Sequence, residues 1–534
     1  MKERGFRGQG SGVRGAVGLA LACLLLAGCG TGTAEEAASG SMADHVGHVH
    51  VPLLRIAWAD VGVPTPFRVS TAGPGGAALL SLMYDTLTWK DSHGIIPWLA
   101  TSWDVSADGR TYTFTLAPSV RWQDGQPLTS ADVAFSFAYY AQHPYRWMSS
   151  NVVAAAQALD GTHVAVQLRQ PYAPFLEDVA GSLPIIPEHV WASVSDPNTY
   201  DGPDATTGSG PFKLAEYQPA TGNYRLVANL DYFRGSVHAS EIQQLNVPNE
   251  TRLQAFRQGD VDLVLATDAS AESMVANQPR LKSYETEPLS VVRLAINTDS
   301  PPLNQLAVRQ AIAYALDRQR IAELMTRAPA ITGGAGAIPP ESPWFNTNLP
   351  SVPFDLAKAQ EALGGQQINL ELLADPSARE PELMQPMLEA AGIHLTVRRA
   401  DAKTRSELLR EGKFQLALTS HIGVGGDPDF LRRWYSGEET NDFAQGSVFH
   451  DPAFAQLGAS EATTLDQAAR KTIVDDMQAT IAAQLPTIVL YYRRFYWLYD
   501  STRFTPMDTW GGLMNGMPLP YNKMTFLQLP GSAR

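Results

Sequence analysis

Residues 120–133 read VRWQDGQPLTSADV and combine a turn with the start of a helix. Asp124-Gly125 is a turn dipeptide, because glycine adopts positive φ at little steric cost. Thr129 precedes a helical run to Tyr140, and Asp132 follows it at the spacing of a capping box. The segment therefore predicts a tight turn that leads into a helix over 129–140.

On either side of this segment, short β-type runs alternate with helical runs, which is typical of a mixed α/β protein. Residues 110–116 place apolar side chains at every second position and predict a half-buried strand. Residues 304–325 predict one long amphipathic helix, and 487–498 predict one buried strand. Three more elements are expected: a strand over 53–58 and helices over 355–363 and 467–484.

The N-terminus has the features of a targeting segment. A basic start precedes the apolar run Ala16–Gly28, which spans only about 20 Å as a helix against a hydrocarbon core of roughly 30 Å. The run ends in Leu26-Ala27-Gly28-Cys29, which resembles a bacterial lipobox. The resemblance implies cleavage after Gly28 and a lipid on the Cys29 thiol. An ordinary secretory signal and an uncleaved anchor are the alternatives.

The remainder of the chain fits an extracytoplasmic protein. The chain has two cysteines, so removal of residues 1–28 would leave only Cys29 and no disulfide. Residues 29–50 are rich in small and polar residues and are expected to form a flexible tether. The formal net charge of −14 disfavours nucleic acid as a partner.

From residue 53 onward, an ordered set of motifs resembles the solute-binding proteins of ABC transporters, family 5, the oligopeptide, dipeptide and nickel class. The motifs are LMYDTL (82–87), PWLATSW (97–103), DGRTYTF (108–114), the quoted segment, PIIPEHVW (184–191), GSGPF (208–212) and VRQAIAYALDR (308–318).

The resemblance implies an α/β, two-lobed periplasmic-binding-protein-like fold of type II, cluster C, with an extra subdomain in lobe one. Lobe one is expected over 51–84, 208–291 and 502–534, and the subdomain over 85–207. Lobe two is expected over 292–501, joined to lobe one by two crossing strands that act as a hinge.

The same resemblance implies the biological role. The chain is expected to capture a small solute, most simply a peptide, and deliver it to an ABC permease with its ATPase subunits. A nickel or other metal complex and an oligosaccharide are alternatives on the same scaffold. We expect a monomer that is lipid-anchored to the outer face of the cell membrane, with no resident cofactor.

One segment of lobe two bears on the ligand. Peptide binders of the family place an Asp, which pairs with the peptide ammonium group, shortly before an Asp-Pro turn. The matching stretch here puts Val424 at that position, which disfavours a free peptide N-terminus. Asp427 of the Asp-Pro turn and His421, at a position where the family often has a pocket aromatic, are candidate ligand contacts; a turn and a structural histidine are the alternatives.

Two further groups of residues are candidates. Aromatic side chains are the usual walls of small-solute sites, although the same residues also build cores. The aromatic candidates are Trp434, Tyr435, Tyr491, Tyr492, Trp497 and Trp510. A histidine cluster at the tether, His45, His48 and His50, is a candidate metal site or a chance cluster.

The enzyme alternatives lack their motifs. The chain has no His-Glu-x-x-His, no phosphate loop and no Gly-x-Ser-x-Gly elbow. We therefore expect a binding protein rather than an enzyme, with a secreted hydrolase that uses two carboxylates as a distant alternative.

Overall fold

The computed structural model describes part of the chain, and all structural statements concern that part. The described residues are 50–69, 75–91, 94–145, 150–266, 270–286, 290–328, 331–332, 336–350, 352–422, 424, 426–435, 448–504 and 522–528. Cys29, His45, His48 and Trp510 lie outside these residues.

The first sheet is built around β1 (Val51–Trp58), whose buried face points into the main hydrophobic cluster. β1 runs parallel to β11 and β12, and Ile56 lies opposite Gln244 and Leu263. The strand order is β13-β20-β12-β1-β11-β9-β8. The other strands are β13 (Leu281–Glu285), β20 (Tyr496–Asp500), β12 (Leu263–Ala266), β11 (Ala239–Asn246), β9 (Asn223–Ala228) and β8 (Phe212–Gln218); α5 (Asn249–Gln258) and α6 (Ser270–Val275) accompany them.

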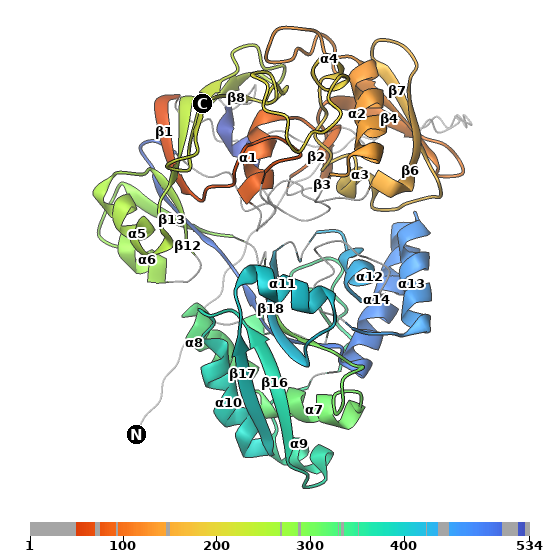
Figure 1. Ribbon diagram of the computed structural model, residues 1–534, viewed down its shortest axis with the longest axis vertical. Helices are drawn as coiled ribbons and strands as arrows, with labels where there is room; N and C mark the ends of the chain where they lie inside the picture. The colour runs from red at the N-terminus through yellow and green to blue at the C-terminus, as the bar shows by residue number, and fades with distance from the viewer. Residues whose placement is uncertain are drawn as a thin grey trace, which may run out of the picture. The chain divides into compact units, whose positions relative to one another are not determined.

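The second sheet has the order β15-β19-β14-β18-β16-β17 and its own hydrophobic cluster. Its strands are β14 (Ser290–Ile296), β15 (Ile331–Thr332), β16 (Ile368–Ala374), β17 (Ile393–Arg399), β18 (Leu416–Ile422) and β19 (Thr487–Arg493). Strand β16 runs parallel to both β17 and β18. Figure 1 shows α10 beside β16 and β17. Side chains of α9 and α10 belong to the same hydrophobic cluster as these two strands.

The helices of this part fall into two groups. The first group packs in the cluster of the second sheet: α7 (Leu306–Ala315), α8 (Arg318–Thr326), α9 (Leu356–Leu363) and α10 (Glu380–Ala391). The second group builds a separate cluster with Val489 and Tyr492 of β19: α12 (Phe430–Tyr435), α13 (Pro452–Thr463) and α14 (Gln467–Gln484). Helix α11 (Ala402–Arg410) lies between β17 and β18 in sequence.

A third sheet, in the order β4-β5-β7-β6, comes from the segment expected to form the extra subdomain. Its strands are β4 (Ala100–Val105), β5 (Thr111–Leu116), β6 (Val153–Ala158) and β7 (His163–Leu168), and the other elements of the segment are β2 (Thr88–Asp91), β3 (Gly94–Pro97), α2 (Ser130–Gln142), α3 (Phe175–Asp178) and α4 (Glu188–Trp191). Strand β5 buries Tyr112, Phe114 and Leu116 as predicted.

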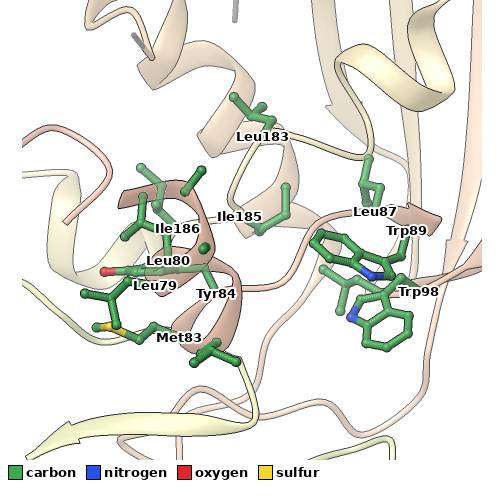
Figure 2. Close-up of a cluster of buried hydrophobic side chains, with 14 of the residues drawn as sticks. Leu79, Leu80, Met83, Tyr84, Leu87, Trp89, Trp98, Leu183, Ile185 and Ile186 are labelled. Atoms are coloured by element: carbon green, nitrogen blue, oxygen red, sulfur yellow. The ribbon is translucent and has the colours of Figure 1, made fainter. Parts of the chain in front are cut away.

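A cluster of buried hydrophobic side chains joins α1 (Gly75–Met83) to this segment (Figure 2). The rings of Trp89 and Trp98 lie 6.0 Å apart. Beside them, Asp85 accepts hydrogen bonds from Trp98 Nε1 at 2.7 Å and from Lys523 Nζ at 3.0 Å. Lys523 stands next to β21 (Leu527–Gln528), which pairs with β10 (Ser236–Val237), so the C-terminal segment closes this core.

The chain passes between the first and second sheets after β13 and after β19. Thr286 and Phe495 meet at this double crossing, where the Thr286 amide donates to the Phe495 carbonyl oxygen at 2.9 Å. The range 292–501 expected for lobe two includes β20, which pairs with β12 and β13 of the first sheet. The change of sheet comes at Arg494-Phe495, before β20 begins.

Two predicted elements are wrong in their extent. The helix expected over 304–325 is two helices, because the chain leaves helical geometry at Leu316 and Asp317 caps α8 by accepting from the Arg320 amide. The strand expected over 487–498 is β19 and β20, which belong to different sheets. Within the described residues, no helix has the length and apolar character needed to cross a membrane.

Candidate ligand-binding site

A pocket of about 330 Å³ lies at the end of the second sheet where the chain crosses to the first. Strands β16 and β18 are parallel, so the residues that end them gather at one edge, the usual place for a ligand in an α/β sheet. The volume suits a small solute. The lining residues are Val292, Met325, Asp375, Ser377, Ala378, Arg379, Glu380, Arg405, Leu409, Leu418, Thr419, Ser420 and Arg493.

Charged side chains dominate the wall of this pocket. Asp375 follows β16, Arg405 comes from α11 and Arg493 ends β19. Arg405 Nη1 lies 3.4 Å from an Asp375 carboxylate oxygen, and Arg493 Nη2 lies 4.0 Å from Glu380 Oε1. With Arg379, the wall holds three guanidinium groups and two carboxylates, so positive charge is in excess.

Glu380 is held in place by the second sheet. The Tyr491 hydroxyl donates to Glu380 Oε1 at 2.7 Å, and Arg493 Nη2 donates to the Tyr491 oxygen at 3.1 Å. Burial raises the pKa of the Tyr491 phenol well above its usual value, so this hydroxyl remains a donor. Tyr491, a predicted ligand contact, therefore positions a pocket carboxylate and is not itself part of the lining.

Arg379 differs from the other two arginines. It is exposed, and among the described residues its guanidinium has no hydrogen-bond or ion-pair partner. A guanidinium in this state is available for a carboxylate or another planar anion.

Three of the predicted contacts gather around the buried Arg293 of β14. Arg293 Nη1 donates to the Tyr435 hydroxyl at 3.0 Å, and its guanidinium carbon lies 4.8 Å from the centre of the Trp434 ring. His421 Nε2 lies 3.4 Å from Arg293 Nη2. Burial, followed by the charge of Arg293, lowers the pKa of His421 well below its usual value. The imidazole is therefore neutral at pH 7 and stands one residue beyond Ser420 of the pocket.

The remaining aromatic candidates are core residues. The Tyr492 hydroxyl donates to the Ile338 carbonyl oxygen at 2.9 Å. Trp497 lies on β20 in the first sheet, where its ring stacks on Trp58 with the centroids 6.3 Å apart. Both side chains are buried and neither lines the pocket.

Asp427 has a protein partner. Its two carboxylate oxygens accept from Arg470 Nη2 at 2.6 Å and Nη1 at 2.7 Å, and Arg470 also pairs with the buried Glu461. Val424 is fully buried in the hydrophobic cluster of α12 to α14. The described residues of this segment thus present no unpaired carboxylate at the position that pairs with the peptide ammonium group in peptide binders of the family.

The histidine cluster is only partly within the described residues. His50 Nε2 lies 2.9 Å from the Ser240 hydroxyl oxygen, and its Nδ1 lies 3.3 Å from the Val237 carbonyl oxygen. Among the residues that the structure describes, no group of three or more His, Cys, Asp and Glu side chains could hold a metal ion.

The charged lining was missed because its members are far apart in sequence. One signal was present: Asp375, Arg379 and Glu380 follow directly on a buried apolar strand, where parallel strands deliver polar groups to a common edge. Arg405 and Arg493 carried no comparable signal, since only the pairing of β18 and β19 with β14 brings their segments together.

Comparison with known proteins shows which family has this architecture. The family model for bacterial extracellular solute-binding proteins, family 5 (Middle), matches residues 94–442. The nickel-binding periplasmic protein of Escherichia coli (strain K12) is 26% identical over 434 residues, which cover 74% of this chain and 81% of that relative. Di/tripeptide-binding protein 2 of Pseudomonas aeruginosa (strain UCBPP-PA14) is 24% identical over 435 residues, which cover 74% of this chain and 81% of the relative.

Solved structures agree on the fold. The ABC transporter-associated periplasmic binding protein DppA from Helicobacter pylori, in complex with peptide STSA, has a TM-score of 0.76 at 22% identity and covers 90% of this chain and 98% of its own. NikA from Brucella suis, in complex with Fe(III)-EDTA, has a TM-score of 0.76 at 21% identity and covers 88% and 98%.

These likenesses confirm the two-lobed periplasmic-binding-protein-like α/β fold, and they place the protein outside the cytoplasm. The family match spans more than half of the chain and includes both the third sheet and most of the second. The chain belongs to the bacterial extracellular solute-binding proteins, family 5, the substrate-binding proteins of ABC importers.

Proposed function

We propose that the charged pocket binds a small solute through a carboxylate or similar anionic group, and that a short peptide is the first candidate. The observation that carries the proposal is the unpartnered Arg379 in a wall with excess positive charge, within a chain of formal net charge −14. Such a wall attracts an anionic group, whereas the net negative charge of the whole chain repels it.

The peptide-binding relatives suggest a peptide as the ligand, and the charges of the pocket limit which ligands can bind. Val424 supplies no charge for a peptide ammonium group, so the Asp375 and Glu380 carboxylates of the pocket are the remaining candidates for that role. A metal chelate that carries carboxylates is the second candidate, because it presents anionic groups and has no ammonium group to satisfy. The Fe(III)-EDTA complex of the Brucella suis protein is an example of such a chelate.

The proposed role in transport also includes closure of the lobes, docking on a permease and anchoring at the membrane. The protein would bind its solute without altering it and close about the crossing at Thr286 and Phe495. It would then dock on an ABC permease as a lipid-anchored monomer, held at the outer face of the membrane by a lipid on Cys29. The boundaries of lobe one, its subdomain and lobe two remain predictions, with the lobe-two limit moved to the crossing at 494–495.

Calorimetric titration of the purified protein tests the proposal. The probes are a pool of di- and tripeptides, the same pool with C-terminal amides, and nickel with a carboxylate chelator. We expect binding of the free-acid peptides, at least tenfold weaker binding of the amides, and no hydrolysis products. Equal binding of the acids and the amides would contradict the role of the pocket.

A matched pair of variants locates the site. Arg379→Gln removes the unpartnered guanidinium and is expected to weaken binding by about tenfold to a hundredfold, the range for a charge-assisted hydrogen bond. Arg398→Gln removes an exposed arginine of β17 that pairs with Glu371 outside the pocket. It is expected to leave binding unchanged.

A further inference from the structure

A buried polar contact joins the third-sheet segment to the α12–α14 group, away from the pocket. The Tyr172 hydroxyl lies 2.6 Å from Asp178 Oδ2 and 3.0 Å from Asp429 Oδ2. Arg433 Nη1 lies 3.5 Å from Asp178 Oδ1. Tyr172 and Asp178 precede the crossing to the second sheet in sequence, whereas Asp429 and Arg433 follow it.

Backbone and apolar contacts accompany these side chains. The Ala173 amide donates to the Ala462 carbonyl oxygen of α13 at 2.7 Å. Ala462 belongs to the hydrophobic cluster of the first and third sheets, although the rest of its helix packs elsewhere. Leu465, just beyond α13, lies against Gly109, where an added Cβ would meet the Leu465 side chain.

The two buried carboxylates of this contact differ in where their cations come from. Asp429 is fully buried and is already bound on its own side by Arg432, with Nε at 2.6 Å and Nη2 at 2.9 Å. Asp178 is also buried, and its nearest cation is Arg433 of the opposite side. Burial raises the pKa of Asp178, and the charge of Arg433 opposes this rise.

We propose that Tyr172, Asp178, Asp429 and Arg433 form a latch that stabilises the closed arrangement of the two lobes. Separation of the lobes exposes Asp178 and Arg433 to water, which solvates both of them. The ion pair therefore mainly sets the register of closure, whereas the contact between the Tyr172 hydroxyl and Asp429 stabilises the closed form. The latch would favour one closed arrangement and still open for release.

The latch would act on affinity from outside the pocket. None of its four residues lines the pocket, so their removal leaves the solute contacts in place. Apparent affinity falls in proportion to the population of the closed form, which makes these four positioning residues.

Tyr172→Phe tests the latch in the full-length protein without any solute. The variant removes the shared hydroxyl and keeps the ring. The matched control is Tyr139→Phe, because the Tyr139 hydroxyl donates to the Val194 carbonyl oxygen at 2.8 Å within one segment. Hydrogen exchange of peptides that span residues 169–178 reports the opening through the Ala173 amide, and Pro174 adds no amide of its own.

We expect exchange at Ala173 to be about tenfold faster in Tyr172→Phe than in the wild type and in Tyr139→Phe. Amides that pair β5 with β7 are expected to keep their rates, and X-ray scattering is expected to give a larger radius of gyration for Tyr172→Phe alone. Equal exchange at Ala173 in the two variants, with superimposable scattering curves, would overturn the latch. Because no solute is added, this outcome is independent of the proposed ligand.

Discussion

Asp427→Asn distinguishes a structural role of the Asp-Pro turn from a role in solute binding. Both oxygens of Asp427 are bound by Arg470, and each of the two side chains is 7% exposed. Removal of one partner from a buried ion pair typically costs about 3–5 kcal/mol. Arg470 keeps its contact with Glu461, so we expect the lower end of this range, about 3 kcal/mol.

Equilibrium urea unfolding, followed by circular dichroism, measures this loss. The control is Asp201→Asn, which removes the same charge from an exposed loop and is expected to change the free energy of unfolding by less than about 0.5 kcal/mol. Peptide affinity, measured by calorimetry where both variants remain folded, is expected to stay within about threefold of the wild type, since Asp427 does not line the pocket.

The opposite pattern would refute this reasoning. If Asp427→Asn unfolds at the urea concentration of the wild type and no longer binds peptide, then the Arg470 pair is not structural. Asp427 would in that case be the ligand contact that the sequence suggested.

Three further outcomes are expected. Tyr172→Phe should raise the dissociation constant for the best free-acid peptide by up to about tenfold with an unchanged preference for acid over amide, whereas a loss of that preference would mean that the pocket itself was damaged. Lys523 should make the free energy of unfolding rise with pH above neutrality, because burial lowers its pKa from 10.5 to about 8 in the folded protein and the unfolded chain therefore holds more protons between these values. The gain is at most about 1.4 kcal/mol per pH unit. Urea unfolding from pH 7.5 to 9.5 measures this gain, which should vanish in Lys523→Met. Cys29→Ala should move the protein from the membrane fraction to the soluble fraction and abolish incorporation of labelled fatty acid; retention of the variant at the membrane would contradict the lipobox.

Local signals in the sequence predicted the local structure well. The helix that begins after Thr129 is present because its cap is contained in four residues, where the Thr129 amide donates to Asp132 Oδ2 at 2.8 Å. Helix α9 likewise begins at Asp355, which accepts from the Lys358 amide, and ends at Gly364 with positive φ. These contacts depend on neighbours in the chain and hardly at all on the tertiary fold.

The predictions failed where a local pattern had two tertiary solutions. The apolar run 487–498 has the composition of one buried strand, and nothing in it reveals that β19 and β20 pair in different sheets. The same run supplied Tyr491, Tyr492 and Trp497 as ligand contacts, because a buried aromatic residue in a core and one in a pocket look alike in sequence. The structure assigns Tyr492 and Trp497 to cores and gives Tyr491 the task of holding Glu380.

Periodicity and turns that short segments encode indicated the α/β class, and the order of the motifs, through its resemblance to family 5, implied the family and the two lobes. The tertiary structure alone decided which charged side chains line one pocket and which residues of the two lobes touch. Arg379, Arg405 and Arg493 converge only through the order of strands in the second sheet, and Tyr172 reaches Asp429 across 257 positions of the chain. Electrostatic contacts act through space, so residues without any sequence pattern become a site once the sheets are assembled.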